Sequence, residues 1–102
     1  MYYIISLTHT MRADKYLTLW RADNKGYCWS KIHAGEYETP EQGYHDNESN
    51  MPISLEEADK LFQLMPYDGT MRPMIKNTKE TWQKLRVKMS KDGLKRILVN
   101  AS

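Results

Sequence analysis

The first third of the chain consists of short apolar runs separated by residues that favour turns. Residues 2–7 are rich in aromatic and β-branched side chains and are apolar on both faces, which is typical of a strand buried inside a sheet. Residues 16–21 alternate between two faces, and the Asp-Asn-Lys-Gly stretch at 23–26 suits a hairpin turn before residues 27–30. The pattern predicts an antiparallel meander of three strands.

The middle of the chain has no periodic pattern. Residues 38–53 are polar and acidic, and Pro40, Gly43 and Pro52 interrupt them. A segment of this length without secondary structure is uncommon in a small domain, and tends to be mobile or to cover a site. We therefore expect a mobile acidic loop over residues 38–53 that becomes ordered on binding.

Two segments have helical periodicity. Ser54 precedes Glu57 by three residues, which is the capping-box arrangement that begins a helix. The apolar positions 55, 58, 61, 62 and 65 then fall on one face, and Pro66 ends the run. A second helix is predicted over residues 78–85, opened by Asn77 and with positions 81, 82 and 85 on its inner face.

The last third of the chain predicts a basic β-hairpin. Residues 85–89 alternate apolar and basic side chains, residues 94–99 form another strand, and the stretch at 90–93 suits the turn because Gly93 tolerates a positive φ. Six cations within thirteen residues would bind a phosphate-bearing ligand if the hairpin aligned them on one face. They are Lys84, Arg86, Lys88, Lys91, Lys95 and Arg96. The other interpretation is a solvated edge strand whose lysines oppose aggregation.

These elements together predict one α+β domain over residues 1–102, with the meander first, two helices packed on one face and the basic hairpin last. Apolar residues make up 40% of the chain and the mean hydropathy is −0.76, so the core is thin, and homodimer formation is one way to bury more surface. The single cysteine, Cys28, excludes an intramolecular disulfide and fits a reducing compartment. Because no leader peptide or membrane span is recognisable, we expect a cytoplasmic protein without membrane contact.

Charge is strongly segregated along the sequence. Residues 1–35 hold five Lys/Arg and two acids, residues 36–70 hold one Lys and nine acids, and residues 71–102 hold nine Lys/Arg and two acids. Clustered charge of one sign produces a local potential that attracts ions, phosphates or an oppositely charged protein. The net charge of +2 hides this segregation.

Catalytic and metal chemistry have no matching motif in the sequence. His9, His33 and His45 lack a carboxylate or a cysteine at ligand spacing, and the chain has no Gly-rich phosphate loop, no Ser-His-Asp set and no CxxC pair. We therefore expect no enzyme activity, no catalytic residue, no metal and no cofactor.

Binding of a phosphate-bearing nucleotide suits the composition better. Arginines grip phosphate oxygens in two places, aromatic rings stack on bases, and the start of a helix offers free backbone N–H groups to an anion. Core packing of the rings and simple helix capping by Asn77 and Thr78 are the alternative interpretations. The predicted ligand-binding residues are Trp20, Arg21, Tyr27, Asn77, Thr78, Lys79, Arg86 and Arg96.

A set of short matches supplies a biological setting. Residues 3–10 (YIISLTHT), 19–21 (LWR), Asn24, 26–28 (GYC), 34–35 (AG), Tyr37 and 77–78 (NT) resemble a group of short, uncharacterised bacteriophage and mobile-element proteins. The resemblance implies an anti-defence accessory protein in the bacterial host cytosol, which sequesters a signalling nucleotide of host immunity or blocks a host defence protein. The alternatives are a protein–protein inhibitor that uses the acidic region 36–59 against a basic host surface, and sequence-tolerant binding of nucleic acid by the basic hairpin.

Overall fold

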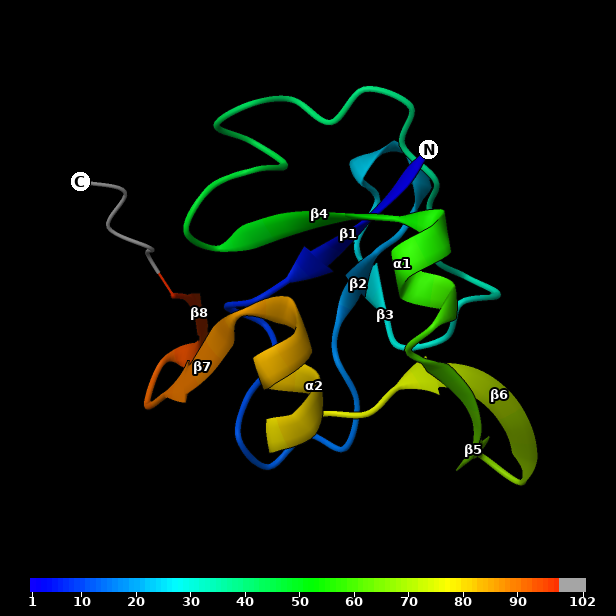
Figure 1. Cartoon of the computed structure of the whole chain (residues 1–102). Coiled ribbons are helices and arrows are strands. Elements are labelled where there is room, and N and C mark those ends of the chain that lie inside the picture. The colour runs from blue at the N-terminus through cyan, green and yellow to red at the C-terminus, as the bar shows by residue number, and fades with distance from the viewer. Residues whose placement is uncertain (98–102) are drawn as a thin grey trace.

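The chain folds around a four-stranded antiparallel sheet. The computed structural model describes residues 1–97, and Figure 1 shows the sheet behind the two helices. The strands lie in the order β3-β2-β1-β4 and comprise β1 (Tyr2–Ser6), β2 (Leu19–Trp20), β3 (Tyr27–Cys28) and β4 (Asn50–Ser54). The short 3-10 helix η1 (Ala22–Asn24) joins β2 to β3. The predicted meander is therefore present as β1, β2 and β3, although β2 and β3 are shorter than predicted.

Strand β4 corrects the prediction for the acidic segment. The loop predicted over residues 38–53 is wrong at its C-terminal end, because residues 50–53 belong to β4, which pairs with β1 along all five positions. A central strand that is buried on both faces needs a hydrogen-bonded neighbour on each side, and β4 is the second neighbour of β1. Pro52 interrupts the sequence pattern but is tolerated because β4 lies at the edge of the sheet. For the irregular residues 38–49, mobility stays a prediction.

The helix that follows β4 is shorter than predicted. Ser54 Oγ accepts a hydrogen bond from the Glu57 backbone N–H at 3.1 Å, which confirms the predicted N-cap of α1 (Leu55–Asp59). The predicted continuation of this helix to residue 65 is wrong, because Phe62–Tyr67 forms strand β5.

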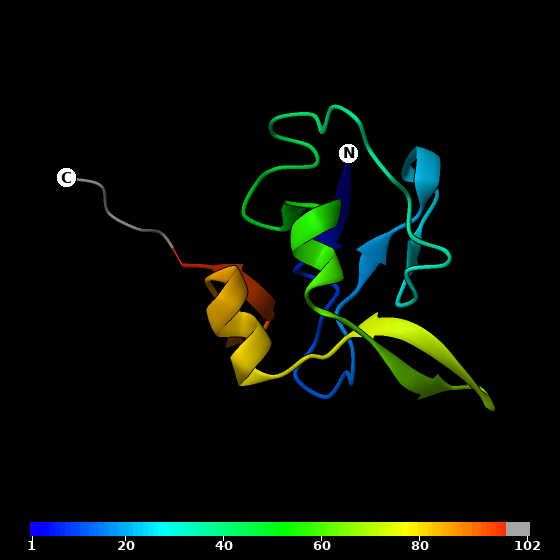
Figure 2. The same ribbon diagram turned by 45° about the vertical axis from the view of Figure 1, so that its right-hand side comes forward.

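A hairpin replaces the rest of that predicted helix. Strand β5 pairs with β6 (Thr70–Ile75) through a two-residue turn, in which φ is 50° at Asp68 and 77° at Gly69. An Asp-Gly pair favours a turn with two positive φ angles, whose twist matches that of the flanking strands. This local preference outweighs the helical spacing of the apolar residues. Figures 1 and 2 show the β5–β6 hairpin projecting from the body of the molecule.

The second helix, α2 (Lys79–Leu85), begins one residue later than predicted and has a different cap. The N-cap is Thr78, whose hydroxyl accepts a hydrogen bond from a backbone N–H in the first turn. Asn77 is not the cap: its amide group donates to two backbone oxygens in the loop at residues 11–14, at 2.9 and 2.8 Å, and accepts from the Trp82 indole at 2.7 Å. Asn77 thus fixes the N-terminal loop against α2.

The C-terminal hairpin consists of β7 (Val87–Ser90) and β8 (Gly93–Arg96). Residues 98–99, which were part of the predicted second strand, lie outside the described residues. The first strand starts later than predicted because Arg86 adopts the left-handed conformation, with φ 58°, that ends α2.

The cations of this region do not align on one face of the hairpin, as binding by the hairpin alone would require. The strand register places Lys88 opposite Lys95, and both side chains are exposed. Arg96 lies on the other face, opposite the buried Val87, and Arg86 belongs to the end of α2.

The hydrophobic core lies on one face of the main sheet. Tyr3 and Ile5 of β1 point into it, and Ala58 of α1 is fully buried against them. Trp82 and Leu85 of α2 pack against the margin of the same core, although α2 makes most of its contacts with β7. Helix α1 therefore packs on this core and α2 borders it, which agrees in part with the predicted packing of two helices on one face, and the projecting β5–β6 hairpin is joined to the core through Ile75.

Candidate functional site: a cationic aromatic pocket

The predicted ligand-binding residues do not meet at one site. Arg21 and Tyr27 line a pocket beside β3, Lys79 lines a different hollow near the start of α2, and Arg96 lines a third beside the acidic loop. The structure places the whole set as follows: Trp20, Arg21 and Tyr27 around the β2–β3 turn, Asn77, Thr78 and Lys79 at the start of α2, Arg86 at its end and Arg96 on β8.

Arg96 is already occupied by contacts within the chain. Its guanidinium forms an ion pair with Asp46 and donates to the Asn47 backbone oxygen at 3.1 Å. These contacts join β8 to the acidic loop, so the role that the structure gives to Arg96 is to hold that loop.

Trp20 packs in an aromatic cluster beneath the same loop. It is buried, and its indole N–H donates to Asn50 Oδ1 at 2.9 Å. Its ring contacts Tyr44 and His45 edge to face, with centroids 5.4 and 5.1 Å apart. Trp20 therefore packs against the loop and positions it, in agreement with the alternative interpretation that this ring belongs to the core.

Arg21 and Tyr27 lie in a pocket of about 470 Å³ between the β3 edge of the sheet and the β5–β6 hairpin. We call it the cationic aromatic pocket. Tyr67 and Arg72 reach it from the hairpin, and neither was predicted as a ligand-binding residue, because the sequence pattern assigned β5 to a helix. Its lining residues are His9, Thr18, Arg21, Tyr27, Cys28, Trp29, Ser30, His33, Tyr67 and Arg72.

Aromatic rings form the walls of the cationic aromatic pocket. The His9 ring stacks on Tyr27, with a centroid distance of 4.2 Å and an angle of 28° between the planes. Trp29 meets Tyr67 edge to face at 6.1 Å, and Tyr16 supports Trp29 from behind at 5.6 Å. Flat rings that line one pocket suit a planar ligand group.

The charge of the pocket is positive. Arg21 and Arg72 line it, no lining residue is a carboxylate, and within residues 1–97 neither arginine forms an ion pair. Arg21 uses its Nε to donate to the Tyr27 backbone oxygen at 3.0 Å, which fixes the side chain and leaves its terminal N–H groups for other acceptors. Arg72 lies over the Tyr67 ring at 5.9 Å.

Arg72 Nε is a buried donor without an acceptor among the described residues. Buried polar groups are satisfied in the great majority of cases, and an unsatisfied one costs roughly 1–3 kcal/mol. The same side chain lines the pocket, and its terminal N–H groups are the ones that an anionic ligand there could contact.

Nucleophilic chemistry has little support in this pocket. Burial raises the pKa of the Cys28 thiol, and nearby Arg21 lowers it by a smaller amount, so the thiol stays protonated and donates to the Ser30 oxygen at 3.6 Å. His9 Nδ1 lies 2.8 Å from Ser6 Oγ, but Ser6 is fully buried and out of reach of a substrate.

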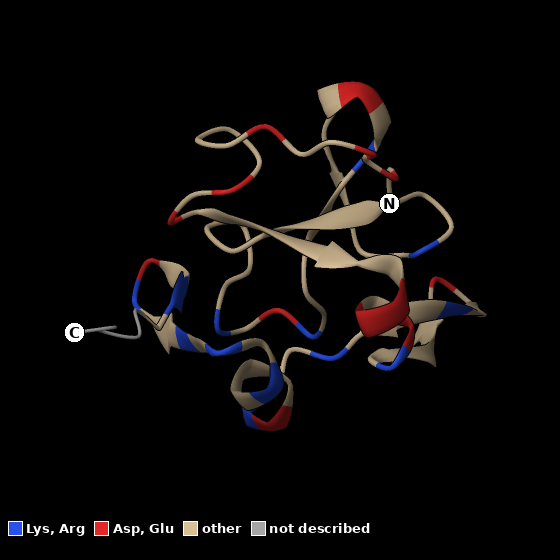
Figure 3. Ribbon diagram, turned by 45° about the horizontal axis from the view of Figure 1, so that its top comes forward, with Lys and Arg blue, Asp and Glu red and all other residues tan. Residues whose placement is uncertain are grey.

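Residues of like charge also gather on two other parts of the backbone (Figure 3). Lysines and arginines gather on α2 and the β7–β8 hairpin, where a hollow of about 330 Å³ is lined by Arg12, Lys79, Lys88 and Trp82 among others. Acidic residues lie on the loop before β4 and on α1.

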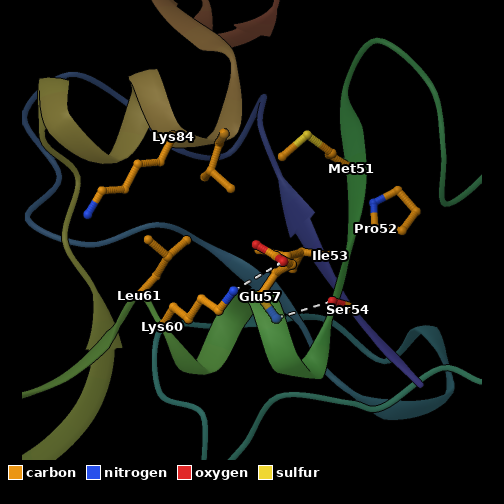
Figure 4. A pocket seen from close by; sticks show the side chains of 9 residues that line it. Met51, Pro52, Ile53, Ser54, Glu57, Lys60, Leu61 and Lys84 are labelled. Atoms are coloured by element: carbon orange, nitrogen blue, oxygen red, sulfur yellow. Dashed lines mark hydrogen bonds and ion pairs between the residues drawn. The ribbon is translucent and has the colours of Figure 1, made fainter.

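A groove of about 530 Å³ separates α1 and β4 from α2 (Figure 4). Its floor is apolar, and Lys60 and Lys84 lie at its rim. Both lysines already form ion pairs within their own helical segments, Lys60 with Glu57 at 3.5 Å and Lys84 with Glu80 at 3.3 Å. The groove is therefore a weaker candidate for an anion than the cationic aromatic pocket.

Comparison with protein-family models, with curated proteins and with solved structures gave no significant match to this chain. No helix within residues 1–97 combines the length and the apolar character needed to cross a membrane. In the same residues, no group of three His, Cys, Asp or Glu side chains is arranged to hold a metal ion. The geometry of the pocket is therefore the basis for a functional proposal.

Proposed function

We propose that this protein binds a phosphate-bearing nucleotide in the cationic aromatic pocket and does not transform it. The observation that carries the proposal is the presence of two arginines, Arg21 and Arg72, in a pocket that has aromatic walls and no carboxylate, with neither arginine in an ion pair within residues 1–97. A phosphate oxygen accepts charge-assisted hydrogen bonds from guanidinium groups, and these bonds are stronger than neutral ones.

The two arginines have complementary roles in this proposal. Arg72 binds the phosphate with its planar fork, while Arg21, held by the Tyr27 backbone oxygen, contributes a second guanidinium from the β2–β3 side. Two guanidinium groups carry two positive charges, which match a phosphate dianion better than they match a singly charged carboxylate ligand.

The aromatic walls are the proposed site for the base. The ring pair His9–Tyr27 and the ring pair Trp29–Tyr67 present flat apolar surfaces on which any base can stack. The volume of about 470 Å³ lies within the range of small-molecule sites and suits a mononucleotide.

Sequestration is the biological role that we attach to this binding. The resemblance to bacteriophage and mobile-element proteins suggests removal of a host immune signal in the bacterial cytosol, and a pocket without an activated nucleophile is consistent with holding the ligand unchanged. The specific proposal is a non-catalytic anti-defence protein.

Binding of nucleic acid is a second proposal with an observation of its own. Asn77 ties the loop at residues 11–14 to α2, and this contact brings Arg12 beside Lys79 and Lys88 around the Trp82 ring. A basic surface with an aromatic ring suits the backbone and bases of a single strand. Its signature is a steep loss of affinity with salt, because phosphate contacts release counterions.

The acidic alternative is a protein–protein inhibitor that acts through the region 36–59. Part of its charge is neutralised within the chain, by the pairs Lys31–Asp59 at 2.8 Å and Arg96–Asp46. Glu56 is exposed and forms no ion pair within the described residues, so its charge reversal is the sharpest test of this alternative.

A thermal-shift screen tests the main proposal. The probes are AMP, ATP, cyclic AMP and a cyclic dinucleotide, with adenosine and inorganic phosphate as controls for the base and the anion alone. A probe at a hundred times its dissociation constant stabilises the protein by roughly 2.7 kcal/mol, which is readily detected. The proposal expects a shift with at least one nucleotide and a smaller shift with either control. The absence of a shift with every nucleotide at low salt would contradict it.

A further inference from the structure

The β5–β6 hairpin carries an uncovered apolar face. The strand register places Phe62 opposite Ile75, Leu64 opposite Pro73, and Pro66 opposite Met71, and directly opposed side chains lie on the same face of a hairpin. This face is therefore apolar along its whole length.

The apolar face begins in the core and continues beyond it. At the base of the hairpin, Ile75 is fully buried and Phe62 packs edge to face on Tyr3 at 5.6 Å. Toward the tip, Leu64 is 65% exposed and Met71 is 55% exposed, where the hairpin leaves the body of the molecule (Figure 2). Uncovered apolar surface of this kind marks interaction sites.

The face, not the edges, is suited to contact. Each strand contains a proline, Pro66 in β5 and Pro73 in β6, and proline has no backbone N–H to donate to an added strand. The Pro73 oxygen already accepts from the Lys31 N–H at 2.9 Å, and the Pro66 oxygen accepts from the Tyr16 hydroxyl at 2.9 Å. Addition of another strand is thus discouraged on both sides.

We infer that this face, formed by Leu64, Pro66, Met71 and Pro73, binds a second copy of the same chain in a two-fold symmetric dimer. A two-fold interface brings the same surface of both copies together, so a charged surface repels itself. Carboxylates predominate on the acidic loop and α1, and Lys and Arg predominate on α2 and β7 (Figure 3), so each of these surfaces would repel a second copy of itself.

The hairpin face has no such conflict. The charged residues of the hairpin are Asp68, which lies in the turn, and Arg72, whose side chain is on the opposite face and lines the cationic aromatic pocket. Two copies can therefore meet through the apolar face without opposing like charges and without closing the pocket. Four side chains fall short of the ~800 Å² per partner of a standard interface, so we expect a weak dimer whose population depends on concentration.

Sedimentation velocity of the full chain over a concentration series tests this inference. The wild-type protein should shift from monomer toward dimer in the micromolar range. The double variant Leu64→Ser with Met71→Ser should weaken dimer formation at least tenfold. The matched control is Met11→Ser with Ile32→Ser, which removes two apolar side chains that are 43% and 64% exposed elsewhere, and it should dimerise like the wild type.

Two outcomes would overturn the inference. One is a wild-type protein that remains monomeric up to about 1 mM, a dissociation constant that corresponds to only about −4.1 kcal/mol. The other is a dimer that persists unchanged in the hairpin variant or is lost in the control. Circular dichroism confirms the fold of each variant, and Leu64→Asp, which places like charges across the two-fold axis, is a second test at the same position.

Discussion

Replacing Arg72 by methionine should separate ligand binding from stability, because the two change in opposite directions. In the free protein, Arg72→Met removes a buried N–H without an acceptor among the described residues, and such a group costs roughly 1–3 kcal/mol. The variant also loses the interaction of the guanidinium with the Tyr67 ring, which is worth about 0.5–1 kcal/mol at a partly exposed site. The difference leaves the stability of the free protein unchanged or raises it by up to about 2.5 kcal/mol.

Binding should respond in the other direction. The lost charge-assisted hydrogen bond to a phosphate oxygen is worth about 1.5–3 kcal/mol, which corresponds to roughly a ten- to hundredfold weaker affinity. Isothermal titration calorimetry with the nucleotide that gives the largest thermal shift measures this loss, and urea unfolding measures the stability of the free variant.

Two further variants make the result specific. Arg12→Met removes the same charge at the basic surface, away from the pocket, and should bind like the wild type. Arg72→Lys keeps the charge but loses the planar fork, so its affinity should fall between those of Arg72→Met and the wild type. Wild-type affinity in Arg72→Met would refute the assignment of Arg72 to the ligand, and a loss of stability of several kcal/mol would refute the interpretation of its Nε as an unsatisfied donor.

Three other predictions concern the fold. Gly35→Ala should destabilise the protein by about 2 kcal/mol or more in urea unfolding, because a Cβ there would lie 2.4 Å from the Ala22 backbone nitrogen, whereas Gly43→Ala, with open space around it and φ 87°, should cost only about 1 kcal/mol. Asn77→Ala should lower the free energy of unfolding by about 2–3 kcal/mol, because it leaves two backbone oxygens and an indole N–H without their partner. A decrease below about 0.5 kcal/mol, which is usual for surface substitutions, would show that these three hydrogen bonds are dispensable. Amide hydrogen exchange should be slow at Met51 and Ile53, whose N–H groups face β1 in this register, and fast exchange at both would contradict the assignment of this segment to a strand.

Much of the N-terminal fold could be predicted because its local signals agree. The strand at residues 2–7, the turn at 23–26 and the Ser54 cap each have a residue pattern that favours one structure. Strand β4 was missed because Pro52 and the polar residues before it hide a short alternation of Met51 and Ile53. What makes this segment a strand is the free edge of β1, which is a tertiary effect.

The β5–β6 hairpin was missed for a different reason. Apolar residues from 55 to 65 satisfy the helical period, and the periodicity outweighed the Asp68-Gly69 pair, which is a strong hairpin signal. With the hairpin unrecognised, the aromatic Tyr67 and the arginine Arg72 could not be placed beside β3. The signal that would have found these two pocket residues was thus present in the sequence.

The site was predicted only in part because charge was counted along contiguous segments. Arg21 and Tyr27 follow from the chemistry of phosphate and base recognition, and both line the pocket. His9 and Arg72 are 63 positions apart, and no local pattern indicates that they line the same pocket. In contrast, the dense basic segment at the C-terminus contributes Arg96 to an internal ion pair.

The three tryptophan indoles offer the most direct test of nucleotide binding in the cationic aromatic pocket. Trp29 lines the pocket. The Trp20 indole N–H donates a hydrogen bond to Asn50 beneath the acidic loop, and the Trp82 indole N–H donates one to Asn77 at the basic surface. Each indole N–H gives a separate signal in a ¹⁵N–¹H correlation spectrum, which single Trp→Phe variants assign. During titration with ATP or AMP, the Trp29 signal should shift while those of Trp20 and Trp82 stay in place. A shift of Trp82 alone would move binding to the basic surface, and no shift at Trp29 at saturating nucleotide would contradict the proposed site.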